Sequence, residues 1–182
     1  PEQFTAYKEA LKKGDPKVAK VNAGAVYPYD IVKTVRHGDS ALADEQWKAL
    51  PNYIGDAMVL PLVDVSGSMT SPIGGKYTPG KVMTSCLDVA VSLGLYCADK
   101  NTGPFKDLFL TFSSSPKFEH VKGTLSQKVR QMERSHWEMS TNLHGAFTEI
   151  LRVATSNKVA PEDMPKVLLI MSDMQFNSCT RF

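Results

Sequence analysis

The sequence lacks the features that mark membrane and secreted proteins. None of its apolar runs approaches the roughly 20 residues needed to span a bilayer, so we expect no membrane contact. The chain has three cysteines, Cys86, Cys97 and Cys179. An odd number of cysteines in apolar segments favours free thiols and a reducing compartment over a disulfide framework. Pro1-Glu2-Gln3 does not open a secretory signal, and we expect a cytoplasmic location.

The sequence also has little excess charge of either sign. Its formal net charge is +2, and residues 1–40 carry seven Lys or Arg against five Asp or Glu. A surplus this small does not by itself indicate nucleic-acid binding, and a helix with a solvated basic face accounts for it. Lys8, Lys12 and Lys13 still fall on roughly one side of a helix, so an RNA contact through these side chains stays open.

The residue patterns of common hydrolytic and zinc enzymes are missing. Gly67-Ser68 lacks the Gly-x-Ser-x-Gly turn of serine hydrolases. The spacing of the histidines and cysteines matches no zinc-ligand pattern. An aspartate-type phosphatase would need a second carboxylate close after Asp64, where Ser66 stands. We therefore expect a protein that is not an enzyme.

What the sequence does contain is an alternation of apolar strands and helices. Strands are expected at 58–63, 107–112, 117–121 and 167–171, and helices at 4–13, 28–36, 41–50, 81–98, 124–134 and 142–154. Strands that are apolar throughout are typical of parallel sheets covered on both faces. The order predicts an α/β fold with a mainly parallel, doubly wound (Rossmann-like) sheet, to which 117–121 adds an antiparallel edge.

The chain is expected to divide near residue 55. Residues 1–55 form a small helical segment that is too short to fold as an independent domain. We expect it to dock on an α/β domain over 56–182, with Trp47 packing inward.

Two core elements contain an unusual residue. Pro61 lies inside the strand 58–63, although proline removes a ladder donor and prefers edges and bulges, so we expect a bulge there. The helix over 81–98 is apolar on nearly every face, which is typical of a buried helix. Its Asp88 is expected to face solvent or to be hydrogen-bonded, and not to bind a metal.

The most informative stretch is Val63-Asp64-Val65-Ser66-Gly67-Ser68-Met69, directly after the first strand. Carboxylate and hydroxyl oxygens at alternate positions suit a hard divalent cation such as Mg²⁺. Further ligands would come from residues 139–142, before a helix, and from Asp173, at the end of the last strand. Asp64 and Asp173 are expected to meet, because ligands of open α/β sheets bind beyond the carboxyl ends of the strands. The open alternative is that Asp64 and the serines only cap a turn.

Asp64-Val65-Ser66-Gly67-Ser68, followed by Thr141 in a loop and Asp173 at a strand end, resembles the metal-ion-dependent adhesion site of von Willebrand factor A domains. The surrounding sequence, which includes Trp47 and residues 172–176, is similar to that of an intracellular and viral family. Members of this family have a von Willebrand factor A-like domain after a helical segment. Ro-type ribonucleoproteins share this layout. The resemblance implies hydroxyl ligands from Ser66, Ser68 and Thr141. It also implies that Asp64 and Asp173 bind Mg²⁺, or Mn²⁺ or Ca²⁺, directly or through water.

The resemblance further implies a cation-dependent protein-interaction module. An open coordination position would accept a carboxylate from a partner protein. Two alternatives remain: a ribonucleoprotein-like component whose helical segment touches RNA while the A-like domain is scaffold, and a structural or assembly protein that has kept the fold without the metal.

The resemblance also implies an incomplete sheet. A complete A domain usually continues after its second Asp with more helices and two strands, whereas nine residues follow Asp173 here. We expect a C-terminally truncated sheet, or one whose missing edge comes from another segment or chain. Because the chain starts without Met, we expect a fragment or processed piece of a longer protein.

Overall fold

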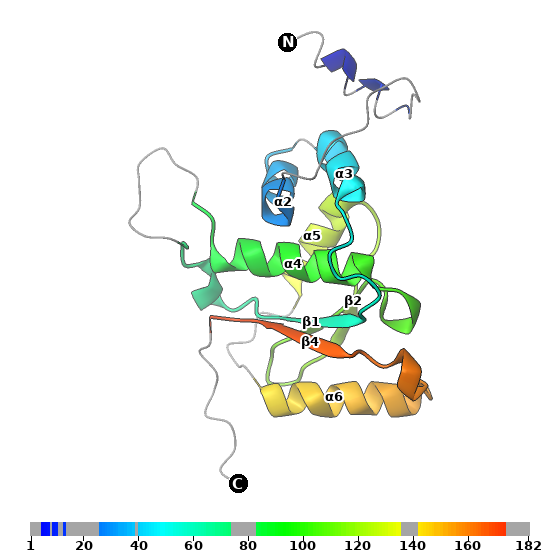
Figure 1. Ribbon diagram of the computed structural model, residues 1–182. Coiled ribbons are helices and arrows are strands. Elements are labelled where there is room, and N and C mark those ends of the chain that lie inside the picture. The colour runs from blue at the N-terminus through cyan, green and yellow to red at the C-terminus, as the bar shows by residue number, and fades with distance from the viewer. Residues whose placement is uncertain are drawn as a thin grey trace.

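A computed structural model describes residues 5–7, 9–10, 13, 26–38, 40–73, 83–135 and 142–173. These residues form a four-stranded sheet in the order β3-β2-β1-β4 (Figure 1). Its strands are β1 (Val59–Val63), β2 (Leu108–Thr111), β3 (Phe118–His120) and β4 (Val167–Met171). β1 pairs in parallel with both β2 and β4, and β3 is antiparallel to β2. The predicted α/β fold with a mainly parallel sheet and an antiparallel edge is confirmed.

Helices cover both faces of the sheet. Among the described residues, the α-helices include α2 (Pro28–Arg36), α3 (Ser40–Ala49), α4 (Cys86–Lys100), α5 (Leu125–Arg134) and α6 (Leu143–Ser156), and the short 3₁₀ turns are η1 (Gly67–Thr70), η2 (Gly103–Phe105) and η3 (Pro161–Asp163). In Figure 1, α4 lies on one face with α2, α3 and α5 beyond it, and α6 lies on the other. Residues 5–7 and 9–10 are helical, within the helix expected over 4–13.

Two apolar clusters hold the layers together. The larger joins α2, α3, α4 and α5 to β1, and it includes Trp47, whose side chain is 5% exposed as predicted. The smaller packs Leu62, Leu110 and Phe112 of the sheet region against Ala146 of α6. The alternation of side chains along a strand explains the division, because Val63 faces the first cluster and Leu62 the second. The division of the chain at residue 55 stays a prediction.

Ion pairs tie α2 to the layer beneath it. Arg36 donates to Asp88 of α4 and also pairs with Glu133 of α5. Burial acts to raise the pKa of Asp88, but hydrogen bonds from the Ser85 N–H and from Arg36 outweigh it and hold that pKa below its ordinary value. Asp88 is therefore a buried, hydrogen-bonded carboxylate, one of the two placements expected for it.

The bulge predicted at Pro61 is wrong. β1 and β4 pair without interruption from Val59 to Val63. Asp64 N donates to Met171 O of β4, whereas Val59 N donates to the Asn101 side chain on the opposite side. By this alternation the ring nitrogen of Pro61 points away from β4. The register with β2 begins only at Leu62, so proline removes no ladder bond and needs no bulge.

The predicted start of the long helix at residue 81 is also wrong. Residues 83–85 are not helical, and α4 begins at Cys86. The Ser85 side chain accepts from Asp88 N and the Asp88 side chain accepts from Ser85 N, which is a capping box.

Among the helices of the described ranges, none combines the length and apolar character that crossing a bilayer requires.

Candidate metal centre

Asp64 follows β1 and lies beside the end of β4. Its backbone N–H donates to Met171 O at 2.9 Å, which extends the parallel register by one residue. The side chain is 1% exposed. Its Oδ1 accepts from Ser66 N at 2.9 Å, and its Oδ2 accepts from Ser172 Oγ at 2.7 Å. A buried carboxylate is therefore fixed at the junction of the two strands.

The serines that follow Asp64 form the next part of the site. Ser66 and Ser68 are half-buried, and their hydroxyl oxygens lie 3.0 Å apart. The turn η1 sets this geometry, since Met69 N donates to Ser66 O at 3.1 Å. The sequence places both hydroxyls within one tight turn because Gly67 separates them.

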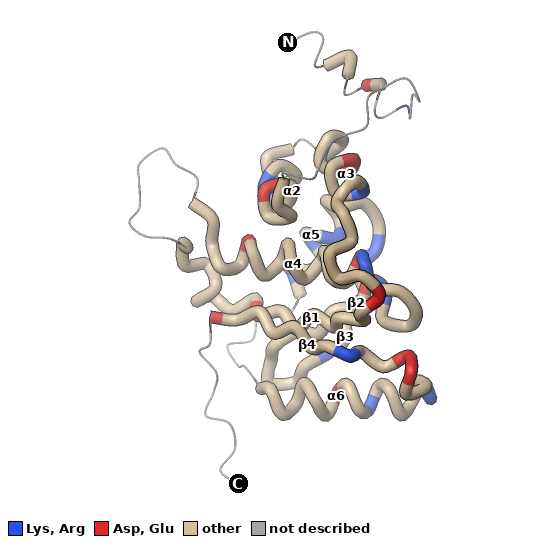
Figure 2. Tube along the Cα trace, in the orientation of Figure 1, with Lys and Arg blue, Asp and Glu red and all other residues tan. Residues whose placement is uncertain are grey.

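Asp173 lies at the same edge of the sheet. It is half-buried and follows Ser172, the residue that hydrogen-bonds Asp64. Figure 2 shows acidic positions at the carboxyl ends of β1 and β4, on one side of the sheet. Because Val63 pairs with Met171, both strands bring an aspartate to the same edge of the sheet, and the meeting of Asp64 and Asp173 in one metal site stays a prediction.

The remaining predicted site residues are less completely described. Thr141 lies outside the described residues. Its neighbour Asn142 caps α6 by accepting from Gly145 N at 2.8 Å, and it donates to Ser114 O, beyond the end of β2, at 3.2 Å. Lys8 and Lys12 of the expected RNA contact also lie outside the described residues. Lys13 is exposed.

The chemistry of the donors fits a hard divalent cation. Asp64, Ser66, Ser68 and Ser172 offer only oxygen atoms, and each Asp64 oxygen keeps lone-pair capacity beyond its one hydrogen bond. Within the part of the chain that the structure describes, no group of three or more His, Cys, Asp and Glu side chains could hold a metal ion. A site at this edge would thus depend on hydroxyl ligands beside its two aspartates.

Sequence reasoning did not assign a role to Ser172. Its hydroxyl donates to Asp64, 108 residues away, and so connects the two strand ends. The sequence feature that could have indicated a role for Ser172 is its position, directly before Asp173 and at the end of an apolar strand. Its partner could be named only once the β1–β4 register was known, because Ser172 lies opposite Asp64 in that register.

Comparison with known proteins identifies the family. A family model described as "Domain of unknown function (DUF7788)" matches residues 59–181, which is more than half of the chain. This chain belongs to the DUF7788 family. The matched region begins at β1 and includes Asp64, Ser66, Ser68, Thr141 and Asp173.

A viral relative matches this DUF7788 chain over almost the full length of the chain. "Uncharacterized protein L728" of Acanthamoeba polyphaga mimivirus is 32% identical over 183 residues, which cover 97% of this chain and 29% of the relative. The chain therefore spans less than a third of that protein. No solved structure matches the chain.

Proposed function

We propose that this DUF7788 chain carries a von Willebrand factor A-like, divalent-cation-dependent protein-interaction module that is not an enzyme. Asp64, Ser66, Ser68, Thr141 and Asp173 would hold Mg²⁺, or Mn²⁺ or Ca²⁺, at the carboxyl edge of the sheet. The observation that carries the proposal is the buried Asp64 carboxylate beside the paired hydroxyls of Ser66 and Ser68. Oxygen ligands of this kind suit Mg²⁺, which usually keeps several waters.

The electrostatics of the donor set support a role in binding a partner. Hydroxyl ligands are neutral, so Asp64 and Asp173 are the carboxylates that offset the ion's two positive charges. If either of them binds through water, a carboxylate from outside gains a strong electrostatic attraction to the ion. The bound ion would then link this chain to an acidic group of another protein.

A cytoplasmic location belongs to the same proposal. Cys86 and Cys97 are free in the structure, and free thiols are typical of reducing compartments. The mimivirus relative is compatible with the viral family suggested by the sequence.

The assignment of the two aspartates can be tested by substitution. Asp64→Ala or Asp173→Ala should remove Mg²⁺ binding measured by calorimetry on metal-stripped protein. Asp64→Ala should also lower the free energy of unfolding by about 1–3 kcal/mol, because Ser66 N and Ser172 Oγ lose their acceptor.

Isosteric variants and a distant control make this test specific. Asp64→Asn and Asp173→Asn keep side-chain volume while removing the charge, and they should still lose Mg²⁺ affinity. Asp163→Asn removes the same charge from an exposed position in η3, before the opposite end of β4, and should bind as the parent does. Unchanged Mg²⁺ and Mn²⁺ affinity in both Asp64 and Asp173 variants would refute the assignment.

A further inference from the structure

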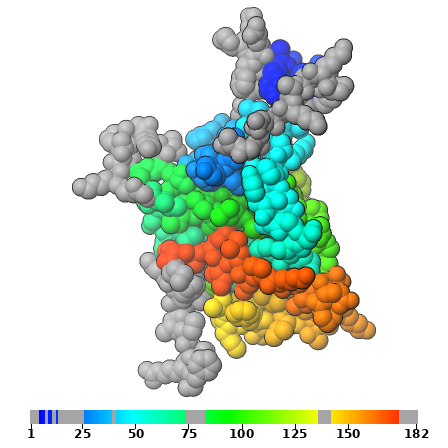
Figure 3. Space-filling model, viewed as in Figure 1, coloured from blue at the N-terminus to red at the C-terminus, as the bar shows by residue number. Residues whose placement is uncertain are grey.

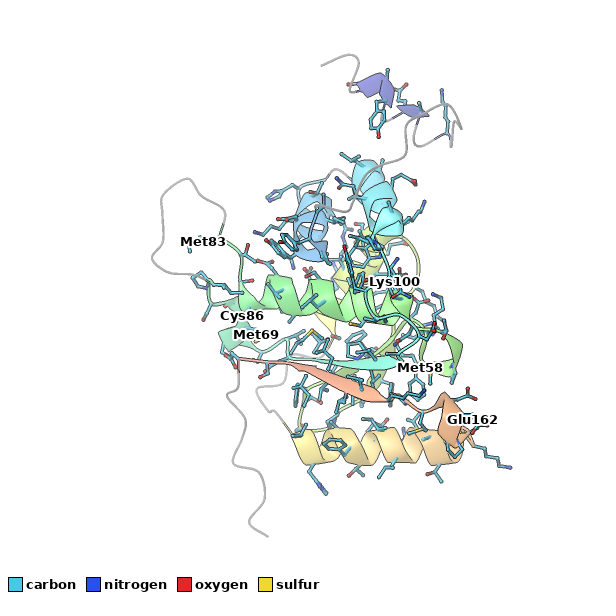
Figure 4. The ribbon with its side chains drawn as sticks, in the orientation of Figure 1. Met58, Met69, Met83, Cys86, Lys100 and Glu162 are labelled. Atoms are coloured by element: carbon cyan, nitrogen blue, oxygen red, sulfur yellow. The ribbon has the colours of Figure 1, made fainter. Side chains whose placement is uncertain are left out.

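An apolar pocket opens beside the candidate metal centre. It has a volume of about 230 Å³ and lies where η1, the first turns of α4 and the end of β4 meet. Its lining residues are Met69, Ile73, Cys86, Val89, Ala90, Met171 and Ser172. Figure 4 shows the labelled Met69 and Cys86 close together between the start of α4 and the strand ends.

The pocket adjoins the predicted ligands directly. Ser172, which lines the pocket, donates its hydroxyl to Asp64 Oδ2 at 2.7 Å. Met69, on another wall, follows Ser68 in the η1 turn and is 2% exposed. Because consecutive Cα atoms are about 3.8 Å apart, a partner chain that brings a carboxylate to this edge carries its neighbouring side chains within reach of the pocket.

The lining determines which neighbouring side chain fits. Among the residues that the structure describes, none of those lining the pocket is charged, so a second charge from the partner would lose its hydration without gaining a counter-ion from them. A dry engineered cavity of about 150 Å³ admits benzene, so a pocket of this size takes a whole Leu or Met side chain. Ile73 at 47% exposed adds apolar surface open to solvent.

We propose that the pocket selects the partner sequence: the metal-binding Asp or Glu of the partner lies next to an aliphatic side chain, which occupies the space between Met69, Val89 and Met171. This inference rests on the proposed function and specifies its partner. The ion binds the carboxylate, and the pocket distinguishes partners by the residue adjacent to it.

Peptide titration followed by methyl NMR tests the proposal. The 182-residue chain, labelled at its methionine methyl groups, is saturated with Mg²⁺ and titrated with acetyl-Leu-Asp-Leu-amide. The methyl signals of Met69 and Met171 should shift, while Met58, before the opposite end of β1 (Figure 4), should not. Acetyl-Gly-Asp-Gly-amide should bind at least about tenfold more weakly, because burying one Leu side chain contributes enough for that ratio. Acetyl-Leu-Asn-Leu-amide should not bind.

Two variants and a matched control locate the effect. Val89→Phe fills the pocket and Ile73→Ala removes an exposed wall; both should keep the parent's Mg²⁺ affinity and lose most of the preference for the Leu peptide. Ile170→Ala, which changes an exposed isoleucine of β4 that does not line the pocket, should keep that preference.

The outcomes separate this inference from the function on which it rests. Mg²⁺ binding together with equal affinity for the Leu and Gly peptides overturns the pocket proposal and leaves the cation-dependent module intact. The proposal is also overturned if the methyl signals of Met69 and Met171 do not shift when the Leu peptide is added to the Mg²⁺-loaded protein. That result is expected if a segment of the same chain fills the pocket. Absence of Mg²⁺ binding in the folded chain contradicts both.

Discussion

At the scale of single residues, Asp64 combines a structural and a candidate functional role. Its carboxylate accepts from Ser66 in the turn and from Ser172 at the end of β4. The turn-capping role that the sequence left open is therefore real, and it does not exclude a metal. The two hydrogen bonds hold the carboxylate in place, which is what a preorganised ligand requires.

The sequence was sufficient to single out Asp64, Ser66, Ser68 and Asp173, because oxygen-bearing residues after apolar strands form a readable pattern. It was insufficient for Ser172, since its partner depends on a strand register that no local pattern encodes. The same holds for the pocket, whose walls come from three separate elements.

Cys97 provides a prediction about pH. Burial raises the pKa of its thiol to about 11, compared with an ordinary value near 9. Below about pH 9 both folded and unfolded chains keep the thiol protonated, so its contribution to stability is complete. As the pH rises from about 9 to 11, the unfolded chain releases this proton and the folded chain does not, so up to about 2–3 kcal/mol of stability is lost.

Chemical denaturation at pH 8, 9.5 and 11 measures this loss. Because other groups titrate in the same range, the relevant quantity is the difference between the parent and Cys97→Ala, whose decline should be smaller. Val91→Ala, which truncates a buried side chain of the same helix that has no titratable group, should decline like the parent. Parallel declines of the parent and Cys97→Ala would show that the buried thiol does not govern this range.

Among the elements, helix α4 packs tightly against the sheet at Gly94. A Cβ at Gly94 would lie 2.6 Å from Val63 Cγ2 and 3.4 Å from the Met132 side chain. Gly94 therefore lets α4 pack against β1, the strand that leads into Asp64.

Gly94→Ala tests this packing against helix propensity. Alanine favours an exposed helix over glycine by about 1 kcal/mol, but here it should lower the free energy of unfolding by about 1–3 kcal/mol because the core becomes overpacked. The double variant Gly94→Ala/Val63→Ala should lose less stability than the two single losses combined. A stabilised Gly94→Ala protein would show that the helix moves away freely.

The elements also show where local patterns were sufficient. The helix predicted to end at residue 134 is α5, which ends at Arg134, and Thr124 and Gln127 form a capping box at its start. The start of α4 was predicted too early because Val82 and Met83 extend the apolar pattern of the helix towards the N-terminus. The true start is marked by Ser85 and Asp88, which have the same capping-box spacing as Thr124 and Gln127. Pro61 needs no bulge because its ring nitrogen points away from β4. That orientation is known only from the sheet.

At the scale of the whole molecule, the sheet presents an open side. Among the described strands, β4 pairs only with β1. Val167 and Ile170 of β4 are 45% and 37% exposed, and Phe147 and Leu151 of α6 are 50% and 64% exposed. Figure 3 shows β4 at the surface, with α6 beneath it. An edge with exposed apolar side chains is a surface for pairing with another segment or chain. We therefore retain the proposal that such a segment completes the sheet.

This open side predicts concentration-dependent self-association of the isolated chain. Ile170→Lys should reduce it, because a lysine on an edge strand disfavours strand pairing. The control Tyr27→Lys places the same charge at an exposed apolar side chain at the start of α2, on the far side of α4 from the sheet, and should associate like the parent. Sedimentation velocity over a hundredfold range of protein concentration measures the effect. A parent chain that stays monomeric throughout would remove the reason to expect a partner at this edge.

We propose that Asp64, Ser66, Ser68, Thr141 and Asp173 bind a divalent cation. Calorimetric titration of the metal-stripped chain with Mg²⁺ and Mn²⁺, at matched ionic strength, tests it most directly. Mg²⁺ should bind saturably to one site of the parent chain, and this binding should be lost in Asp64→Asn. Absence of saturable binding in a chain that circular dichroism shows to be folded would contradict it.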